Sequence, residues 1–288
     1  MNKNYVIAID LGGTNVRVGI IDNDLNIIEV LREETNKDGK EHLSQQIIRM
    51  ISSLHYQKYN IKKVGISACG LTKNNHIQLL PNLMYSDYDL KGDIEKIFPN
   101  FTVLIQNDAN CTAFAEARYG ASKDVDNSFF ITISTGIGGA LIINKSIVDL
   151  PFEIGHEFIE YKSQPIEREK ILSGNGLVYL CNDNKLPIQK ASDFFLLCEY
   201  KNELALEILN YWKQRISQFL ANIQLLYNCD TIILSGGVMK SSHLFINDLI
   251  SISNEYLKPF PVKKVNIKLA QFDQNAGLIG GACVALEM

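Results

Sequence analysis

A short glycine turn near the start of the chain is the feature that most constrains its fold. The apolar segment 5–9 ends at Asp10, and after Leu11-Gly12-Gly13-Thr14-Asn15 a second apolar segment runs from 16 to 21. This pattern predicts two buried strands joined by a tight turn. An ordinary hairpin would explain it equally well. However, successive amides in a glycine turn also form a concavity that binds anions, and phosphate is the anion that we expect there.

The residues of this turn are candidate contacts to a nucleotide. Asp10 stands at the end of the first strand, where a carboxylate can hold a magnesium ion that bridges phosphate oxygens. We expect the phosphates themselves to meet the segment that follows, namely Gly12, Gly13, Thr14 and Asn15.

Composition favours a soluble enzyme that acts on small molecules. The 288 residues carry a net charge of -4 and no basic cluster, so nucleic acid is not an expected partner. No apolar run approaches the ~20 residues of a membrane span, and the strand-like start at Tyr5 leaves no room for a signal peptide. The six cysteines are scattered singly, which is typical of reduced thiols. We therefore expect a cytoplasmic protein with no membrane partner.

Two further glycine segments follow strand-like runs. Segment 129–134 leads into Thr135-Gly136-Ile137-Gly138-Gly139, and 140–143 returns, which repeats the design of the N-terminus. Two copies of one layout predict an α/β fold with two related halves that face a cleft. Segment 231–234 ends at a glycine pair that can provide a ledge free of side chains for adenine. The predicted nucleotide contacts in these segments are Thr135, Gly136, Gly236, Gly237 and Val238.

Five motifs together resemble those of the ROK sugar kinases, in the same order and spacing. The motifs are Asp10 to Thr14, Asn107 to Asn110, Ser134 to Gly139, Glu153-Ile154-Gly155-His156 and Ser235 to Val238. ROK proteins belong to the actin, hexokinase and Hsp70 superfamily, so the resemblance implies two RNase H-like (actin-like ATPase) domains flanking a cleft. We expect a small domain at 1–108, completed by the C-terminal helix 276–288, and a large one at 109–275. ROK repressors carry an additional N-terminal helix-turn-helix, so the kinase branch is expected here.

Asp108 is the candidate catalytic base. It follows the strand 103–105 and opens the helical segment 109–119, where a helix N-terminus favours an ionised carboxylate. Phosphoryl transfer to an alcohol needs such a base within reach of the hydroxyl, although a plain N-cap would also explain an aspartate here. By resemblance, Asp108 takes the proton of a sugar 6-hydroxyl and Asn107 holds sugar hydroxyls.

The resemblance also implies the residues that bind the sugar. Polar groups should pair with vicinal hydroxyls, although a match as short as Glu-x-Gly-His is also common in surface turns. The residues implied are Gly70, Asn82, Asn107, Asp108, Glu153, His156 and Glu169, with Glu167 as the competitor of Glu169.

One departure from the family concerns a metal. In most ROK proteins the histidine of the Glu-x-Gly-His motif shares a zinc ion with three cysteines, but residues 157–173 contain none. A closed tetrahedral site needs four ligands, so we expect no zinc. The shortened loop should then be held by packing of Phe158, Ile159 and Ile166.

The resemblance implies an ATP:sugar 6-phosphotransferase that uses ATP and Mg²⁺. D-allose is the favoured aldohexose, because the segments 236–239 and 256–261 look most like those of allose kinases. N-acetylmannosamine kinase and glucokinase are the alternatives. A non-catalytic sugar sensor and an ATP-driven binding protein are rivals of a different class. A homodimer is among the expected assemblies, because related kinases are commonly dimers or larger.

Overall fold

The computed structural model describes residues 3–272 and 275–288, which belong to two compact units. Unit 1 comprises Met1–Arg118 and Gln274–Met288, and unit 2 comprises Tyr119–Asp273. The predicted boundary at 108 therefore lies too early. Helix α3 (Asp108–Arg118) belongs to unit 1, because it packs closely on the C-terminal helix α9 (Ala276–Glu287).

Unit 1 is built on a five-stranded sheet in the order β3-β2-β1-β4-β8. Strand β2 is antiparallel to both β1 and β3, whereas β4 runs parallel to β1 and β8 runs parallel to β4. The bounds are β1 (Tyr5–Leu11), β2 (Asn15–Asp22), β3 (Ile27–Glu34), β4 (Lys63–Ala68) and β8 (Thr102–Asn107). The predicted turn at the N-terminus is thus a hairpin in the middle of a larger sheet.

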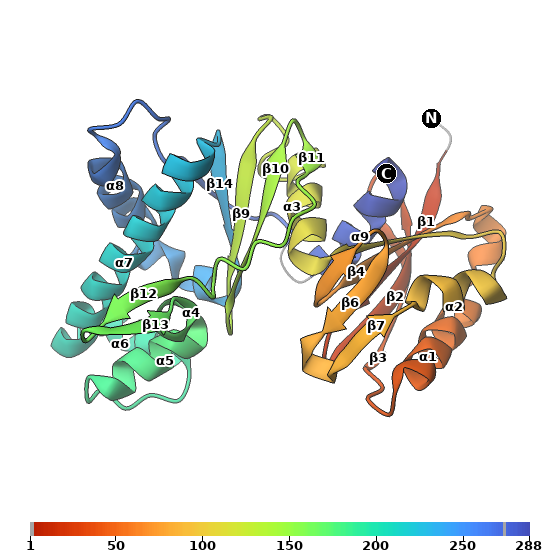
Figure 1. The fold of residues 1–288 in the computed structure, drawn as a ribbon, viewed down its shortest axis with the longest axis horizontal. Coiled ribbons are helices and arrows are strands. Elements are labelled where there is room, and N and C mark those ends of the chain that lie inside the picture. Colours follow the sequence, from red (N-terminus) through yellow and green to blue (C-terminus); the bar gives the residue numbers. More distant parts are fainter. Residues whose placement is uncertain (1–2, 273–274) are drawn as a thin grey trace. The chain divides into compact units, whose positions relative to one another are not determined.

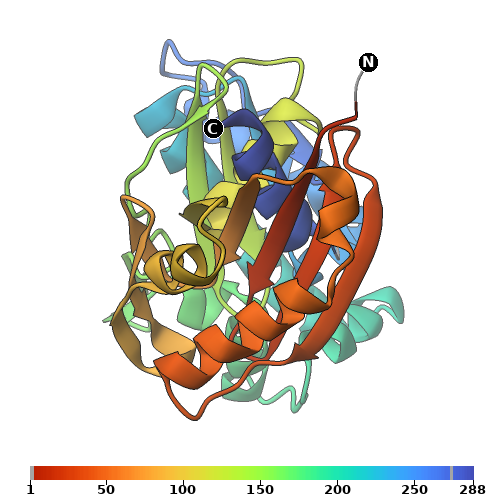
Figure 2. The same ribbon diagram turned by 90° about the vertical axis from the view of Figure 1, so that its right-hand side faces the viewer.

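The alternation of side chains along β1 divides the core of unit 1 between the two faces of the sheet. Ile7, Ile9 and Leu11 pack beneath α1 (Lys40–Ser53) and α2 (Leu90–Ile97), while Val6 and Ala8 pack against α9. Figure 2 shows α1 lying across the sheet, and Figure 1 shows α9 beside β1 and β4.

Glycines bring α9 unusually close to this sheet. A Cβ at Gly65 would lie 1.9 Å from the carbonyl oxygen of Gly281, and one at Gly277 would lie 2.2 Å from Oδ1 of Asp10. The start of α9 is therefore fixed beside the end of β1. The rest of unit 1 comprises η1 (Tyr56–Tyr59) and a small antiparallel sheet with its adjoining turn, formed by β5 (Leu71–Lys73), β6 (His76–Leu80), η2 (Pro81–Leu83) and β7 (Tyr85–Tyr88).

Unit 2 repeats the design with a five-stranded sheet in the order β11-β10-β9-β14-β15. Strands β9 and β10 form the second hairpin, and β14 runs parallel to β9. The bounds are β9 (Ser128–Ile133), β10 (Ile137–Ile143), β11 (Ser146–Ile147), β14 (Thr231–Ser235) and β15 (Ile267–Leu269). A separate hairpin consists of β12 (Phe158–Tyr161) and β13 (Gln164–Glu167).

The helices of unit 2 enclose a second core. Trp212 on the long helix α7 is fully buried and donates Nε1–H to the carbonyl oxygen of Leu172 at 2.9 Å. No helix within the described residues is both long and apolar enough to cross a bilayer. The helices are α4 (Glu169–Leu172), α5 (Gly174–Asp183), α6 (Ala191–Glu199), α7 (Glu203–Tyr227), η3 (Gly237–Leu244) and α8 (Ile246–Leu257).

Candidate active site

The turn between β1 and β2 is held in shape by a side chain that the sequence analysis missed. Gly12 N–H donates to the carbonyl oxygen of Asn15 at 3.0 Å, which closes the turn. Thr35, just after β3, donates its hydroxyl to Gly12 O at 2.7 Å and its N–H to Thr14 O at 2.9 Å. Thr35 is buried and Thr14 is exposed. The turn is therefore held by hydrogen bonds on its buried side and is accessible to solvent on the other side. Nothing in the sequence marks Thr35, because its partners are backbone atoms.

Asn82 lies against this turn. A Cβ at Gly13 would lie 2.6 Å from the Cβ of Asn82, so only glycine permits this approach. Asn82 is exposed, and within the described part of the chain its amide has no hydrogen-bond partner. The geometry places a free amide beside the predicted phosphate turn.

Asp10 is already paired with a cation. Its Oδ2 accepts hydrogen bonds from Arg17 Nη2 at 2.6 Å and Arg17 Nε at 3.0 Å. Arg17 stands directly opposite Asp10 in the pairing of β1 with β2, and the Asp10 side chain is 23 % exposed. The Asp10 charge also contributes to raising the pKa of Asp108, so negative potential extends over both carboxylates. The carboxylate of Asp10 fits a magnesium ion bound through water or phosphate, and Arg17 is the cation that competes for this carboxylate.

Asn107, rather than Asp108, caps helix α3. Its Oδ1 accepts the N–H groups of Ala109 at 2.9 Å and Asn110 at 3.2 Å, while its Nδ2 donates to Gly70 O at 2.9 Å. A Cβ at Gly70 would lie 2.1 Å from the carbonyl oxygen of Leu79, so no residue with a side chain fits at this position. Gly70 and Asn107 therefore support each other, and the capping role is filled without Asp108.

The Asp108 carboxyl group is exposed, and one of its oxygens accepts the N–H of Ala109 at 2.8 Å. Desolvation by the surrounding protein, followed by the nearby charge of Asp10, raises the pKa of Asp108 to about 6. We expected the helix N-terminus to lower this pKa, but the backbone hydrogen bond is outweighed. A base of pKa near 6 is ionised at neutral pH and well matched to proton transfer.

In unit 2, the turn between β9 and β10 rests on Glu169. The N–H of Ile137 donates to Glu169 Oε2 at 3.1 Å, and a Cβ at Gly136 would lie 2.6 Å from the same oxygen. The N–H of Gly174 donates to Ser134 O at 2.6 Å, which ties the turn to the start of α5. Thr135 at its tip is exposed.

The glycine pair after β14 combines one structural and one unconstrained position. Gly236 has φ of 98°, and a Cβ there would lie 2.3 Å from Ile133 O. At Gly237 a Cβ would meet no atom within 4 Å. Val238, a predicted nucleotide contact, is 3 % exposed in the core of unit 2, so its side chain is not available to a ligand.

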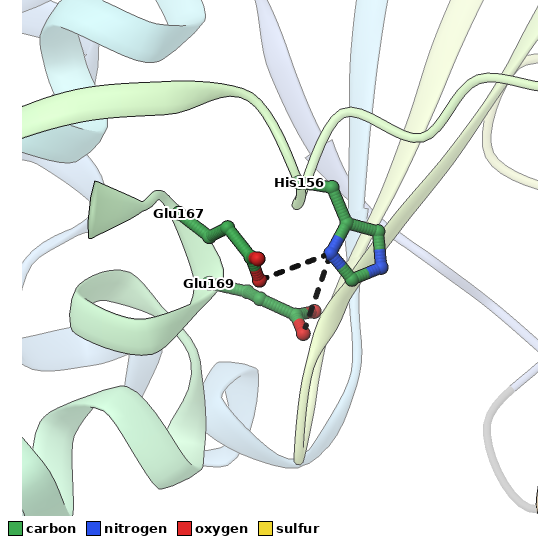
Figure 3. A group of neighbouring side chains, drawn as sticks. All are labelled: His156, Glu167 and Glu169. Carbon is green, nitrogen blue, oxygen red and sulfur yellow. Dashed lines mark hydrogen bonds and ion pairs between the residues drawn. The ribbon is translucent and has the colours of Figure 1, made fainter. Parts of the chain in front are cut away.

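The predicted sugar-site residues of unit 2 lie in one cluster, of which Figure 3 shows His156, Glu167 and Glu169. His156 Nδ1 lies 3.3 Å from Glu167 Oε2 and 4.0 Å from Glu169 Oε1, and Nε2 lies 3.9 Å from Glu153 Oε2. Glu153 and His156 are exposed at one turn, where His156 N–H donates to Glu153 O at 3.0 Å. Glu167 and Glu169 flank this turn at different positions, so both belong to the cluster.

The loop around this cluster is held by a buried arginine that the sequence analysis missed. Arg168 is 2 % exposed, donates Nη1–H to Ile154 O at 3.1 Å and to Glu157 Oε2 at 2.6 Å, and lies 4.0 Å from the centre of the Phe219 ring. Ile159 and Ile166 pair across the β12–β13 hairpin and pack on the core, as expected. Phe158 is 69 % exposed, so its predicted packing role is wrong, because its strand position faces solvent.

This cluster does not suit a structural zinc ion. Among the described residues, only His156, Glu167 and Glu169 form a group of three potential ligands with all ligand atoms within 4.8 Å. No thiolate is among them, Glu169 Oε2 is hydrogen-bonded to Ile137, and Glu167 Oε1 lies 3.4 Å from Lys170 Nζ. A closed zinc site needs a fourth ligand and free lone pairs.

Comparison with known proteins supports one family. The model of the ROK family matches residues 6–288. A glucokinase of Halalkalibacterium halodurans is 23 % identical, over 98 % of this chain and 94 % of its own. A xylose repressor of Bacillus spizizenii is 26 % identical, over 98 % of this chain and 77 % of its own.

Solved structures confirm the predicted fold class. A ROK hexokinase from Thermus thermophilus has a TM-score of 0.84 at 21 % identity, over 98 % of both chains. A ROK glucokinase from Streptomyces griseus, solved with glucose and AMPPNP, has a TM-score of 0.77 at 22 % identity, over 99 % of this chain and 100 % of that one. Both units thus have the actin-like ATPase fold. With a family model that covers almost its whole length, the chain belongs to the ROK family.

Proposed function

We propose that this protein is a sugar kinase that transfers the γ-phosphoryl group of ATP to the 6-hydroxyl of an aldohexose. The observation that carries the proposal is the state of Asp108. Because Asn107 caps α3, the exposed Asp108 carboxyl is free to act, and its pKa of about 6 keeps it ionised at neutral pH. An aspartate with only a structural role would need neither an exposed carboxyl group nor a raised pKa.

In this reaction the oxygen of the sugar 6-hydroxyl attacks the γ-phosphorus, and the bond to the β-phosphate oxygen breaks to release ADP. The hydroxyl proton passes to the carboxylate of Asp108. The free amide of Asn82 and the remaining N–H of Asn107 would bind sugar hydroxyls, as would Glu153, His156 and Glu169.

Backbone amides would bind the nucleotide. The turn from Gly12 to Asn15, whose Gly12 N–H is already bonded to Asn15 O, and the turn at Thr135 and Gly136 would present their other N–H groups to phosphate, while Gly237 would offer adenine an open ledge. A magnesium ion near Asp10 would neutralise charge on the phosphate oxygens.

D-allose is our preferred sugar, with glucose and N-acetylmannosamine as alternatives. The direct test measures ADP release from ATP and Mg²⁺ with each of these sugars, and without sugar. We expect release that depends on one hexose, and the same assay on Asp108→Asn should lose it. Failure of every hexose to support ADP release would overturn the proposal.

The similarity to a xylose repressor favours a second candidate, a sugar-binding sensor without turnover. Calorimetry with the same sugars separates the two. Sugar binding with no phosphoryl transfer would establish the sensor, whereas saturable turnover would exclude it.

A further inference from the structure

His156 is exposed, and acidic side chains lie near both nitrogens of its ring. Nδ1 lies 3.3 Å from Glu167 Oε2 (Figure 3), and Nε2 lies 3.9 Å from Glu153 Oε2. The two nitrogens are not equivalent, because only the contact at Nδ1 is a hydrogen bond.

Glu167 is fixed in place from three directions. It is the last residue of β13, and its backbone pairs with Phe158 across the hairpin. Its Oε1 lies 3.4 Å from Lys170 Nζ, while its Oε2 takes the bond to His156. The next residue, Arg168, is anchored in the core of unit 2. Glu167 therefore has little freedom to leave the imidazole ring.

The charge of Glu167 decides which way its hydrogen bond runs. The hydrogen bond to His156, aided by Lys170, lowers the pKa of Glu167, so the group is ionised at neutral pH. An ionised carboxylate can only accept a hydrogen bond. Nδ1 of His156 must then be the nitrogen that carries the proton.

We propose that Glu167 is a positioning residue that keeps the proton on Nδ1 of His156, so that Nε2 of the neutral ring presents a lone pair to the sugar. This inference rests on the proposed function only in naming a sugar as the ligand. Glu167 itself does not touch the sugar. It acts through the orientation and tautomer of the imidazole, as carboxylates do for many functional histidines.

The proposal defines the ligand chemistry of this side of the site. Nε2 of His156, the carboxylate of Glu153 and Oε1 of Glu169 are then all acceptors. The part of the ligand that they bind must supply hydrogen-bond donors, which vicinal hydroxyl groups do. A sugar that lacks a hydroxyl at one of these positions would leave a lone pair unpaired and bind less tightly.

The first test observes the ring directly by ¹⁵N NMR of the imidazole nitrogens in the full-length protein. The chain has five histidines, and His156→Gln assigns the signal. In the wild type we expect the proton on Nδ1. In Glu167→Met the neutral ring should revert to the Nε2–H form, which free histidine prefers. Glu167→Gln keeps an acceptor oxygen and should retain the proton on Nδ1.

The second test separates KM from kcat for the preferred sugar. We expect Glu167→Met to raise KM about tenfold, the size of one lost hydrogen bond of about 1.4 kcal/mol, with kcat within about threefold. Glu167→Gln should restore most of the affinity. In a His156→Gln background, Glu167→Met should have no further effect on KM. Glu160→Gln, on the exposed side of the same hairpin, is the matched control and should change neither measurement.

Each outcome decides the proposal. An Nδ1–H ring that persists in Glu167→Met overturns it, as does equal loss of affinity in the His156→Gln background. Zinc-dependent shifts of the ring signals that vanish in Glu167→Met would also overturn it, in favour of a cation site. If no sugar is phosphorylated by the wild type while the ring behaves as expected, the proposed function fails and the role of Glu167 stands.

Discussion

At the scale of single residues, the proposed base Asp108 lowers the stability of the folded chain at neutral pH. The folded chain raises its pKa from 3.8 to about 6, so the ionised form is disfavoured relative to the unfolded chain. The folded state therefore holds this proton at pH values where the unfolded state has released it. The stability lost through this group accumulates as the pH rises from about 4 to 6 and persists above.

We predict that Asp108→Asn raises the melting temperature at pH 7 and lowers turnover by about 10²–10⁴-fold, the usual contribution of a general base. Asparagine keeps the size of the side chain but carries no charge to desolvate. Calorimetry at pH 7 and pH 4 checks the first effect, which should shrink at pH 4. Near-normal turnover in single-turnover measurements would exclude Asp108 as the base.

The activity of the wild type should fall at acid pH. Only the ionised carboxylate accepts the proton, so we expect kcat to decline about tenfold per pH unit below about 6. A pH profile of the single-turnover rate measures this. The residual rate of Asp108→Asn should lack this acid limb, and an unchanged limb in the variant would assign it to another group.

At the scale of elements, the two glycines in the turn after β14 differ in what the fold requires of them. Gly236 needs its glycine because of its positive φ and its contact with β9, whereas Gly237 has open space where a Cβ would stand. The fold does not require the glycine at 237, and this is the position where we propose that adenine approaches the backbone.

Gly237→Ala should therefore keep the melting temperature and raise KM for ATP several-fold, because its methyl group would occupy the adenine ledge. Thermal unfolding and ATP titration check the two halves of this expectation. Gly236→Ala is the contrasting variant and should destabilise the protein by about 1–3 kcal/mol through backbone strain. An unchanged KM for ATP in Gly237→Ala would remove Gly237 from the nucleotide site.

The hairpin β12–β13 and its surroundings contain features that could not be predicted from the sequence. Repeated strand and glycine patterns predicted the two strand–turn–strand units and the two related halves, because those signals are local, whereas the five-stranded sheets themselves emerged only from the structure. Arg168 and Thr35 were missed, because each acts on carbonyl oxygens that are brought near only by folding. The exposure of Phe158 was missed for the same reason, since an apolar side chain does not reveal which face of a hairpin it occupies.

At the scale of the whole molecule, the sequence predicted a loop without zinc, and the structure offers an alternative anchor. The buried guanidinium of Arg168 joins the turn at Ile154 to the helix α7 through Phe219. We predict that elemental analysis of the purified protein finds no stoichiometric zinc, and that chelation followed by added Mg²⁺ leaves activity intact. One zinc ion per chain would contradict this prediction.

Helix α9 has a consequence for how the protein is made. The strands of the unit 1 sheet precede unit 2 in the chain, yet one face of this sheet is covered by α9, which is synthesised after all of unit 2. Unit 2 is a continuous stretch and can fold while α9 is still untranslated. During synthesis, Val6 and Ala8 should remain uncovered until α9 is made, so the nascent sheet of unit 1 exposes an apolar face while unit 2 is translated.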